Sequence, residues 1–140
     1  MKRLLVLLGL VIVAGCGGEK EEAPAATTIT VERYNLSGSL ELTDKEGITE
    51  APDGGCQGSS GYDDIRFGTD VVVSDPSNRV IGTSRLGEGN WTGDHCIFRY
   101  VVSNLPRVDF HKVEVSHRGQ LTYSHQELVN NNWTVEGELG

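Results

Sequence analysis

Residues 69–86 read TDVVVSDPSNRVIGTSRL, and this stretch decides the fold class. Two short segments rich in β-branched residues flank the tetrapeptide DPSN at positions 75–78. Asp, Pro, Ser and Asn are the residues from which β-turns are built. The segment therefore predicts two antiparallel strands joined by a hairpin turn.

An alternation of apolar and polar residues, with a period of two, is found on both sides of this hairpin. Apolar residues alternate with polar ones in short runs near positions 29–31, 40–42, 96–102, 113–115 and 133–139. Turn residues bound these runs, as expected for strands with one buried face. We therefore expect an all-β chain that forms a single antiparallel β-sandwich of about seven strands.

Two segments depart from this pattern. In YSHQELVNNNW (123–133), Ser124 and Glu127 have the spacing of a capping box, which predicts one short helical turn before the last strand. Residues 48–68, ITEAPDGGCQGSSGYDDIRFG, are rich in glycine and poor in apolar residues. They predict a long loop that contains Cys56, and long loops in compact domains are often functional.

The N-terminus has the features of an export signal. Lys2 and Arg3 precede an apolar run, residues 4–13, that is too short to span a bilayer. The following residues, VAGC at 13–16, resemble the lipobox of bacterial lipoproteins. The resemblance implies cleavage before Cys16 and attachment of fatty acyl chains, such as palmitate, to that residue. An ordinary secretory signal with an accidental cysteine is the alternative.

These features divide the chain into three parts. Residues 1–15 are expected to be a lipoprotein signal peptide, residues 16–26 a lipidated flexible linker and residues 27–140 the β-sandwich domain. Two or more acyl chains anchor a protein stably, whereas one chain binds only marginally. We therefore expect a lipid-anchored protein on the extracytoplasmic face of the cell membrane.

The charge of the chain limits its partners. The signal peptide removes Lys2 and Arg3, which leaves 10 basic residues against 20 acidic ones. Such an acidic surface argues against nucleic acid and against direct adsorption to anionic lipid. Partners are expected to be the membrane, through the anchor, and an envelope protein or small ligand; no cofactor is expected.

Two cysteines remain after Cys16. Cys56 and Cys96 stand 40 positions apart in an exported, oxidising setting, which predicts a disulfide. A metal site or a reactive thiol is the alternative, because Asp94 and His95 directly precede Cys96. Adjacent strand residues point to opposite faces, however, which argues against a shared metal.

Residues 54–140 also resemble a known class of protein. The segments that carry the likeness include CxGxxGYDDI (56–65), HCIFRY (95–100), LPRVDF (105–110) and VEVSHRG (113–119). They resemble small, largely uncharacterised secreted lipoproteins of actinobacteria. Their layout is also similar to prealbumin-like sandwiches such as carboxypeptidase regulatory-like domains. The resemblance implies a location and a fold but no activity.

The glycine-rich loop holds the most polar cluster. Asp63 and Asp64 could ligate calcium, yet the spacing of a calcium-binding loop is absent. The competing interpretation is that one of these carboxylates accepts backbone N–H groups of the loop. Tyr62 and Trp91 are candidate binding aromatics, and Trp91 could instead cover one end of the sandwich.

Three histidines are candidates for acid–base or metal chemistry. His111 and His117 share the inward parity of residues 113 and 115, so they would lie at either end of that stripe as rim histidines, too far apart to bind one ion. His125 lies in the predicted helical turn. Trp133 is expected to anchor the core.

Two classes of function remain. The first is a non-enzymatic binding or structural module of the cell envelope that engages its partner through its loops. The second is a metal-dependent envelope protein, using calcium or zinc, or a hydrolase, with Asp63, Asp64 and a histidine in its site. An enzyme would need those side chains within hydrogen-bond reach of one another, whereas a binding module needs only an exposed patch.

Overall fold

The computed structural model describes residues 17–18, 23–25 and 29–140. The expected signal peptide and the lipidation site Cys16 lie outside the described residues, as does much of the expected linker. Within the described ranges, no helix has both the length and the apolar character needed to cross a bilayer.

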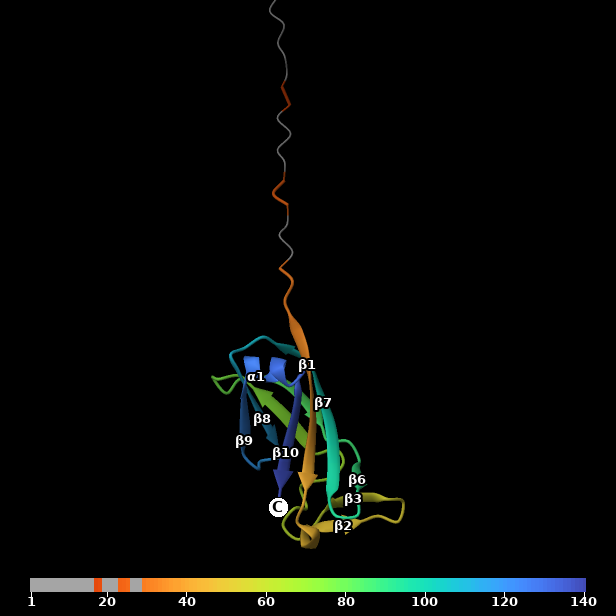
Figure 1. Ribbon diagram of the computed structural model, residues 1–140. Helices are drawn as coiled ribbons and strands as arrows, with labels where there is room; N and C mark the ends of the chain where they lie inside the picture. The colour runs from red at the N-terminus through yellow and green to blue at the C-terminus, as the bar shows by residue number, and fades with distance from the viewer. Residues whose placement is uncertain (1–16, 19–22, 26–28) are drawn as a thin grey trace, which may run out of the picture.

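Ten strands and one short α-helix make up the described part of the chain (Figure 1). One sheet has six strands: β1 (Arg33–Leu42), β2 (Ile48–Glu50), β3 (Gly55–Gly58), β6 (Gly89–Trp91), β7 (Cys96–Pro106) and β10 (Thr134–Leu139). The other has four: β4 (Asp70–Ser74), β5 (Val80–Arg85), β8 (Phe110–Val115) and β9 (Gln120–Ser124). A 3-10 turn, η1 (Lys45–Gly47), precedes β2, and α1 (His125–Asn130) joins β9 to β10. The all-β prediction is confirmed, whereas the expected number of about seven strands is wrong.

The strand order shows a second departure from the expected sandwich. The six-stranded sheet runs β10-β1-β7-β6-β3-β2 and the four-stranded sheet β5-β4-β8-β9. All neighbouring strands are antiparallel except β1 and β10, which pair in parallel from Ser37↔Thr134 to Leu42↔Leu139. The chain reaches this parallel position because α1 reverses its direction after β9, so a wholly antiparallel arrangement does not form.

Two local predictions are confirmed, the hairpin turn after β4 and the capping box of α1. β4 and β5 form the predicted hairpin, and Asp75 holds its turn by accepting hydrogen bonds from the backbone N–H groups of Ser77 and Arg79. Ser124 caps α1: its hydroxyl accepts from the N–H of Glu127, whose carboxylate in turn accepts from the N–H of Ser124. These hydrogen bonds satisfy backbone donors that the turn or the helix end leaves free.

Two expectations about strand positions are wrong, and β9 is a strand that the sequence pattern does not predict. Residues 29–31 are not a strand, since Ile29 and Val31 are exposed and β1 starts only at Arg33. The segment 48–68 is not one long loop, because β2 and β3 form a hairpin inside it. β9 was not anticipated, and its exposed residues explain why: it is an edge strand with little apolar period.

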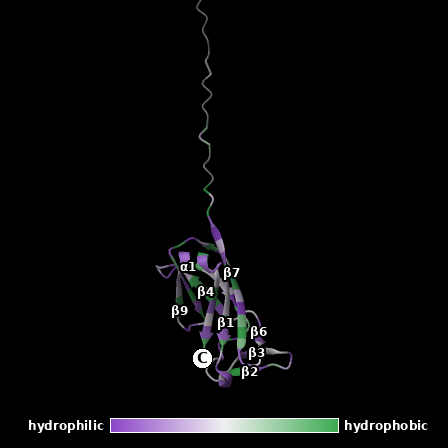
Figure 2. Ribbon diagram, viewed as in Figure 1, coloured by the Kyte–Doolittle hydropathy of each residue, from purple (hydrophilic) through white to green (hydrophobic). Residues whose placement is uncertain are grey.

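One core lies between the two sheets and draws on both. It includes Leu36, Leu40, Phe98 and Val102 of the larger sheet and Val71, Val73 and Val113 of the smaller one. Figure 2 shows apolar residues along β4 and β7, while α1 is mostly hydrophilic. Leu128 is the buried residue of α1 and closes one end of this core.

The two ends of the domain differ. β1 begins at the end that carries α1, whereas β2, β3 and β6 gather at the opposite end (Figure 1). A strand of ten residues spans about 30 Å, so β1 sets the distance between these ends. The end with β2, β3 and β6 also carries the glycine-rich loop.

Candidate functional site

The predicted disulfide is present and fixes the glycine-rich segment to the sheet. Cys56 on β3 bonds to Cys96 on β7, with their Cα atoms 5.9 Å apart. These two strands are not neighbours, because β6 lies between them. The bridge crosses β6 at Gly89, where a Cβ atom would overlap the Sγ of Cys96 and the carbonyl of Cys56. The missing side chain of Gly89 therefore makes room for the bridge.

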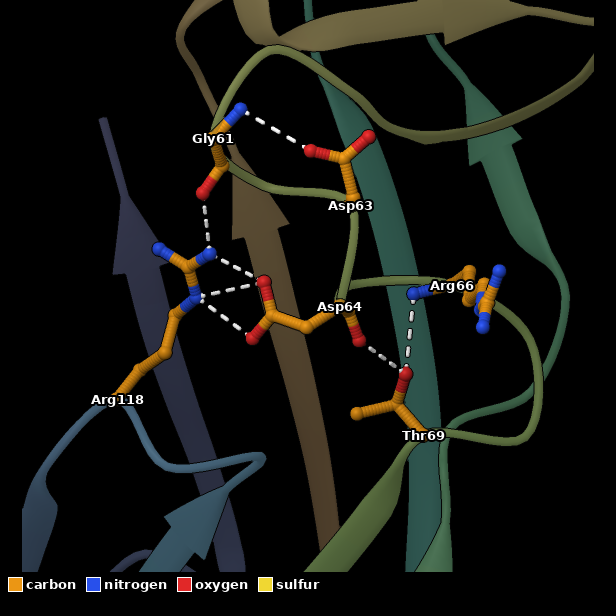
Figure 3. A network of polar contacts seen from close by, with 6 residues as sticks. All are labelled: Gly61, Asp63, Asp64, Arg66, Thr69 and Arg118. Carbon is orange, nitrogen blue, oxygen red and sulfur yellow. Dashed lines mark hydrogen bonds and ion pairs between the residues drawn. The ribbon is translucent and has the colours of Figure 1, made fainter.

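The two aspartates of the loop have separate partners (Figure 3). Asp63 accepts a hydrogen bond from the backbone N–H of Gly61 at 3.2 Å, as the structural interpretation of this cluster predicts. Asp64 instead binds a side chain, since Arg118 Nε donates to its two carboxylate oxygens at 3.1 and 2.9 Å. Arg118 Nη2 also donates to Asp64 and to the carbonyl of Gly61. Both carboxylates thus hold the loop in shape.

Arg118 is the centre of this network. It belongs to the turn between β8 and β9, 54 residues from Asp64, and so it ties the four-stranded sheet to the loop. Its hydrogen bonds are the main reason why the pKa of Asp64 falls to about 2. The guanidinium also lies over the ring of Tyr62, 4.9 Å from the ring centroid, in a cation–π contact. Tyr62, a predicted binding aromatic, is therefore half-buried in an internal contact.

Asp94, His95 and Cys96 do not converge. Asp94 pairs with Lys45, His95 with Glu41, and Cys96 forms the disulfide. Among the residues that the structure describes, no group of three or more His, Cys, Asp or Glu side chains comes together as metal ligands would.

The histidines occupy very different environments. His111 is fully buried, so its expected position at the rim is wrong, whereas His117 is 98% exposed in its side chain. His111 Nε2 donates to the carbonyl of Pro106 at 3.2 Å, and burial lowers the pKa of His111. Its neighbours are aromatic: Trp133 lies edge-on at 5.3 Å and His125 at 6.4 Å between ring centroids.

The two tryptophans cover opposite parts of the core. Trp133 stacks on Tyr34 with ring centroids 4.3 Å apart and packs against the core beside α1, as expected of an anchor. Trp91 ends β6, is partly buried and also packs against the core. Of its two predicted roles, the contacts fit the one that covers an end of the domain.

An open groove lies along the β2–β3 hairpin and β6. It has a volume of about 480 Å³, and its walls include Glu50, Asp53, Gln57, Phe67, Glu88 and Asn90, with Cys56 and Gly89 at its base. Phe67 is 69% exposed, so most of this large apolar residue is open to solvent. The groove thus joins an exposed aromatic ring, three carboxylates and a floor held by the disulfide.

The sequence interpretation missed Phe67 although it predicted that the surrounding segment would be functional. Phe67 follows Arg66 in a stretch with no strand period, so no pattern assigned its side chain to a buried or exposed face. The available signal was the isolation of a large aromatic residue within a polar, glycine-rich segment.

A second, smaller cleft opens on another side of the domain. It lies where the edge strands β9 and β10 of the two sheets face each other, and its volume is about 190 Å³. Its lining is mainly apolar and includes Leu40, Tyr100, Val113, Leu121 and Leu139, with Arg118 at its margin.

Comparison with known proteins adds no assignment to this geometry: no protein-family model, curated protein or solved structure matches the chain.

Proposed function

We propose that the chain is a lipid-anchored binding module of the bacterial cell envelope. Cys16 holds it to the extracytoplasmic face of the membrane, and the groove beside Phe67 receives its partner. The positive, then apolar segment and the lipobox-like residues 13–16 support the anchor. The likeness of residues 54–140 to small secreted lipoproteins supports the same location.

The position of the groove suits this role. The linker, residues 17–26, would reach roughly 20 Å as a flexible coil. It leads to β1, which starts at the α1 end of the domain, whereas β2, β3 and β6 gather at the opposite end (Figure 1). Residues of these three strands line the groove. A domain tethered in this way presents the groove away from the membrane, toward partners in the envelope.

The exposure of Phe67 is the observation that carries the proposal. Its ring loses favourable burial in the free protein, and a partner that covers it would recover about 25 cal/mol for each Å² of apolar surface. Isolated exposed apolar residues are common, but this one borders a groove whose base includes half of the disulfide. A fixed floor lowers the entropy that binding must remove.

The charge of the groove indicates the chemistry of the partner. Glu50, Asp53 and Glu88 border it, and no lysine or arginine is among the described residues that line it. A partner with a positively charged group and an apolar contact for Phe67 complements this surface, and its binding should weaken with salt.

A binding module explains the loop better than a metal-dependent enzyme or hydrolase does. Asp63 and Asp64, the residues that such an enzyme would use, are engaged by Gly61 and Arg118. No histidine is among the described residues that line the groove.

Photo-crosslinking in the native membrane tests the proposal. A photoreactive amino acid at Gln57, an exposed position in the groove, should give a discrete adduct. Phe67→Ser and Glu88→Lys should each remove that adduct without lowering the melting temperature. Val101→Ser, at another exposed apolar residue on the outer face of β7, should leave it unchanged. An adduct that persists in both groove variants, or no adduct at all, would overturn the assignment of the groove.

A further inference from the structure

The cleft between β9 and β10 has the properties of a small-ligand site that is separate from the groove. It is lined by six apolar or aromatic side chains: Leu40, Tyr100, Val113, Val115, Leu121 and Leu139. Leu121 is 51% exposed, so the cleft is open to solvent along β9. Its volume of about 190 Å³ equals about six water volumes of ~30 Å³, which suits a small organic ligand.

Two glycines create this space. Gly38 and Gly137 lie on the inner faces of β1 and β10, where the neighbouring inward positions carry leucine or valine. Tyr100 of β7 pairs with Gly38, and its ring lies where a side chain at Gly38 would be. It thereby extends across β1 toward β10. Gly137 adds no side chain of its own, so the gap beside Leu40 and Leu121 remains open.

Two residues that border this apolar space, Tyr100 and Arg118, carry polar groups. The hydroxyl of Tyr100 forms no hydrogen bond with a described side chain, and burial is the main reason why the pKa of Tyr100 rises to about 12. At neutral pH this hydroxyl is an uncharged group that can donate a hydrogen bond. Arg118 uses Nε and Nη2 for Asp64 and Gly61, whereas Nη1 makes no hydrogen bond to a described residue (Figure 3). An apolar pocket with few convergent polar groups is the usual form of a small-molecule site.

We propose that this cleft binds a small amphipathic carboxylate, whose alkyl body fills the space beside Gly137 and whose carboxylate meets Nη1 of Arg118. The apolar lining favours the alkyl chain of the ligand, and the guanidinium favours its planar carboxylate through charge-assisted hydrogen bonds. Glu138 also borders the cleft and opposes an anion there. This site does not depend on the anchor or on the groove.

Octanoate is the probe. Octanol is its uncharged counterpart, and acetate is a carboxylate without the long alkyl chain. Each is titrated into the purified protein with labelled leucine and valine methyl groups, which are followed by NMR. We expect octanoate to shift the methyl signals of Leu121 and Leu139, while those of Leu86 and Leu105 elsewhere in the core stay in place. Octanoate should bind about tenfold more tightly than octanol, the ratio that one charge-assisted contact supports, and more tightly than acetate, which lacks the apolar chain.

Variants test both halves of the site. A Cβ at position 137 would lie 3.4 Å from Leu40 Cδ1 and 3.6 Å from Leu121 Cδ1, so Gly137→Leu can enter the cleft and should abolish octanoate binding. Thr134→Leu adds the same side chain to the outer face of β10 and should leave the affinity unchanged. Glu138→Gln should tighten octanoate but not octanol.

Three results would overturn the proposal. Equal affinities for octanol and octanoate would remove the role of Arg118, and equal affinities for acetate and octanoate would remove that of the apolar lining. No shift of Leu121 and Leu139 with octanoate would remove the site. The comparison of the three probes uses the unaltered protein, so it tests the proposed site even if Gly137→Leu fails to fold.

Discussion

Arg118 and Asp64, 54 residues apart in the chain, form a bidentate ion pair that fastens the turn after β8 to the glycine-rich loop. Asp64 stands three residues before Phe67, which lines the groove, and Arg118 borders the β9–β10 cleft. One contact therefore supports the geometry of both candidate sites.

Removing this ion pair should cost stability in a pH-dependent way. Asp64→Asn should lower the free energy of unfolding at pH 7 by about 1 kcal/mol, a modest value because water partly screens the pair. The folded pKa of Asp64, about 2, lies below its ordinary value of 3.8, so its contribution is present above pH 4 and lost as the pH falls toward 2. Urea unfolding at both pH values checks this, and an equal difference at pH 2 and pH 7 would contradict it.

The disulfide should contribute more than any single contact of the loop. It closes a segment of 40 residues, for which the chain-entropy model gives about 4 kcal/mol. The double variant Cys56→Ser, Cys96→Ser should melt well below the unaltered protein. Reductant should lower the melting temperature of the unaltered protein and leave that of the double variant unchanged. A reductant-insensitive unaltered protein would show that the bridge does not form.

Gly38 is required by the ring of Tyr100. A Cβ at Gly38 would overlap that ring, so Gly38→Ala should destabilise the fold by about 1–3 kcal/mol, the usual cost of overpacking a core. In a Tyr100→Leu background the same substitution should cost much less, because the overlapping ring is gone. A cost that is the same in both backgrounds, measured by chemical unfolding, would exclude this clash.

His111 should make the stability sensitive to weak acid. Burial lowers its pKa below the ordinary 6.5, so the unfolded chain takes up a proton more readily than the folded one. Its contribution to stability is complete above about pH 6.5 and declines as the pH falls below that value. His111→Gln should flatten the decline between pH 7.5 and pH 5.

The exposed His117 provides the control for this measurement. Its side chain is 98% exposed, so His117→Gln should leave the slope of stability against pH unchanged. If His111→Gln and His117→Gln had the same slope, the burial of His111 would not be the cause of the decline.

The local features of the fold, which depend on a few adjacent residues, could be predicted from the sequence. The turn at 75–78 and the capping box of Ser124 and Glu127 each depend on a few adjacent residues, and both formed as predicted. The parallel pairing of β1 with β10 could not be foreseen, because strand order depends on packing between segments about 100 residues apart. Residues 29–31 have a strand period, but β7 ends at Pro106 opposite Arg33, so they remain outside the described sheet.

The candidate sites could be predicted only in part. The glycine-rich segment drew attention through its composition, and Asp63 and Asp64 proved to hold its shape. The partner of Asp64 could not be found from the sequence, since nothing marks Arg118 as a distant ligand. The β9–β10 cleft depends on the missing side chains at Gly38 and Gly137, and the disulfide beside the groove depends on the one missing at Gly89. The effect of each glycine depends on what packs opposite it.

The most direct test of a lipid-anchored module is the native intact mass of the protein extracted from its own membranes. We predict the mass of residues 16–140 plus the acyl chains on Cys16, less the two hydrogens lost in the Cys56–Cys96 bridge. A mass without lipid would contradict the anchor and leave an ordinary secreted domain in its place.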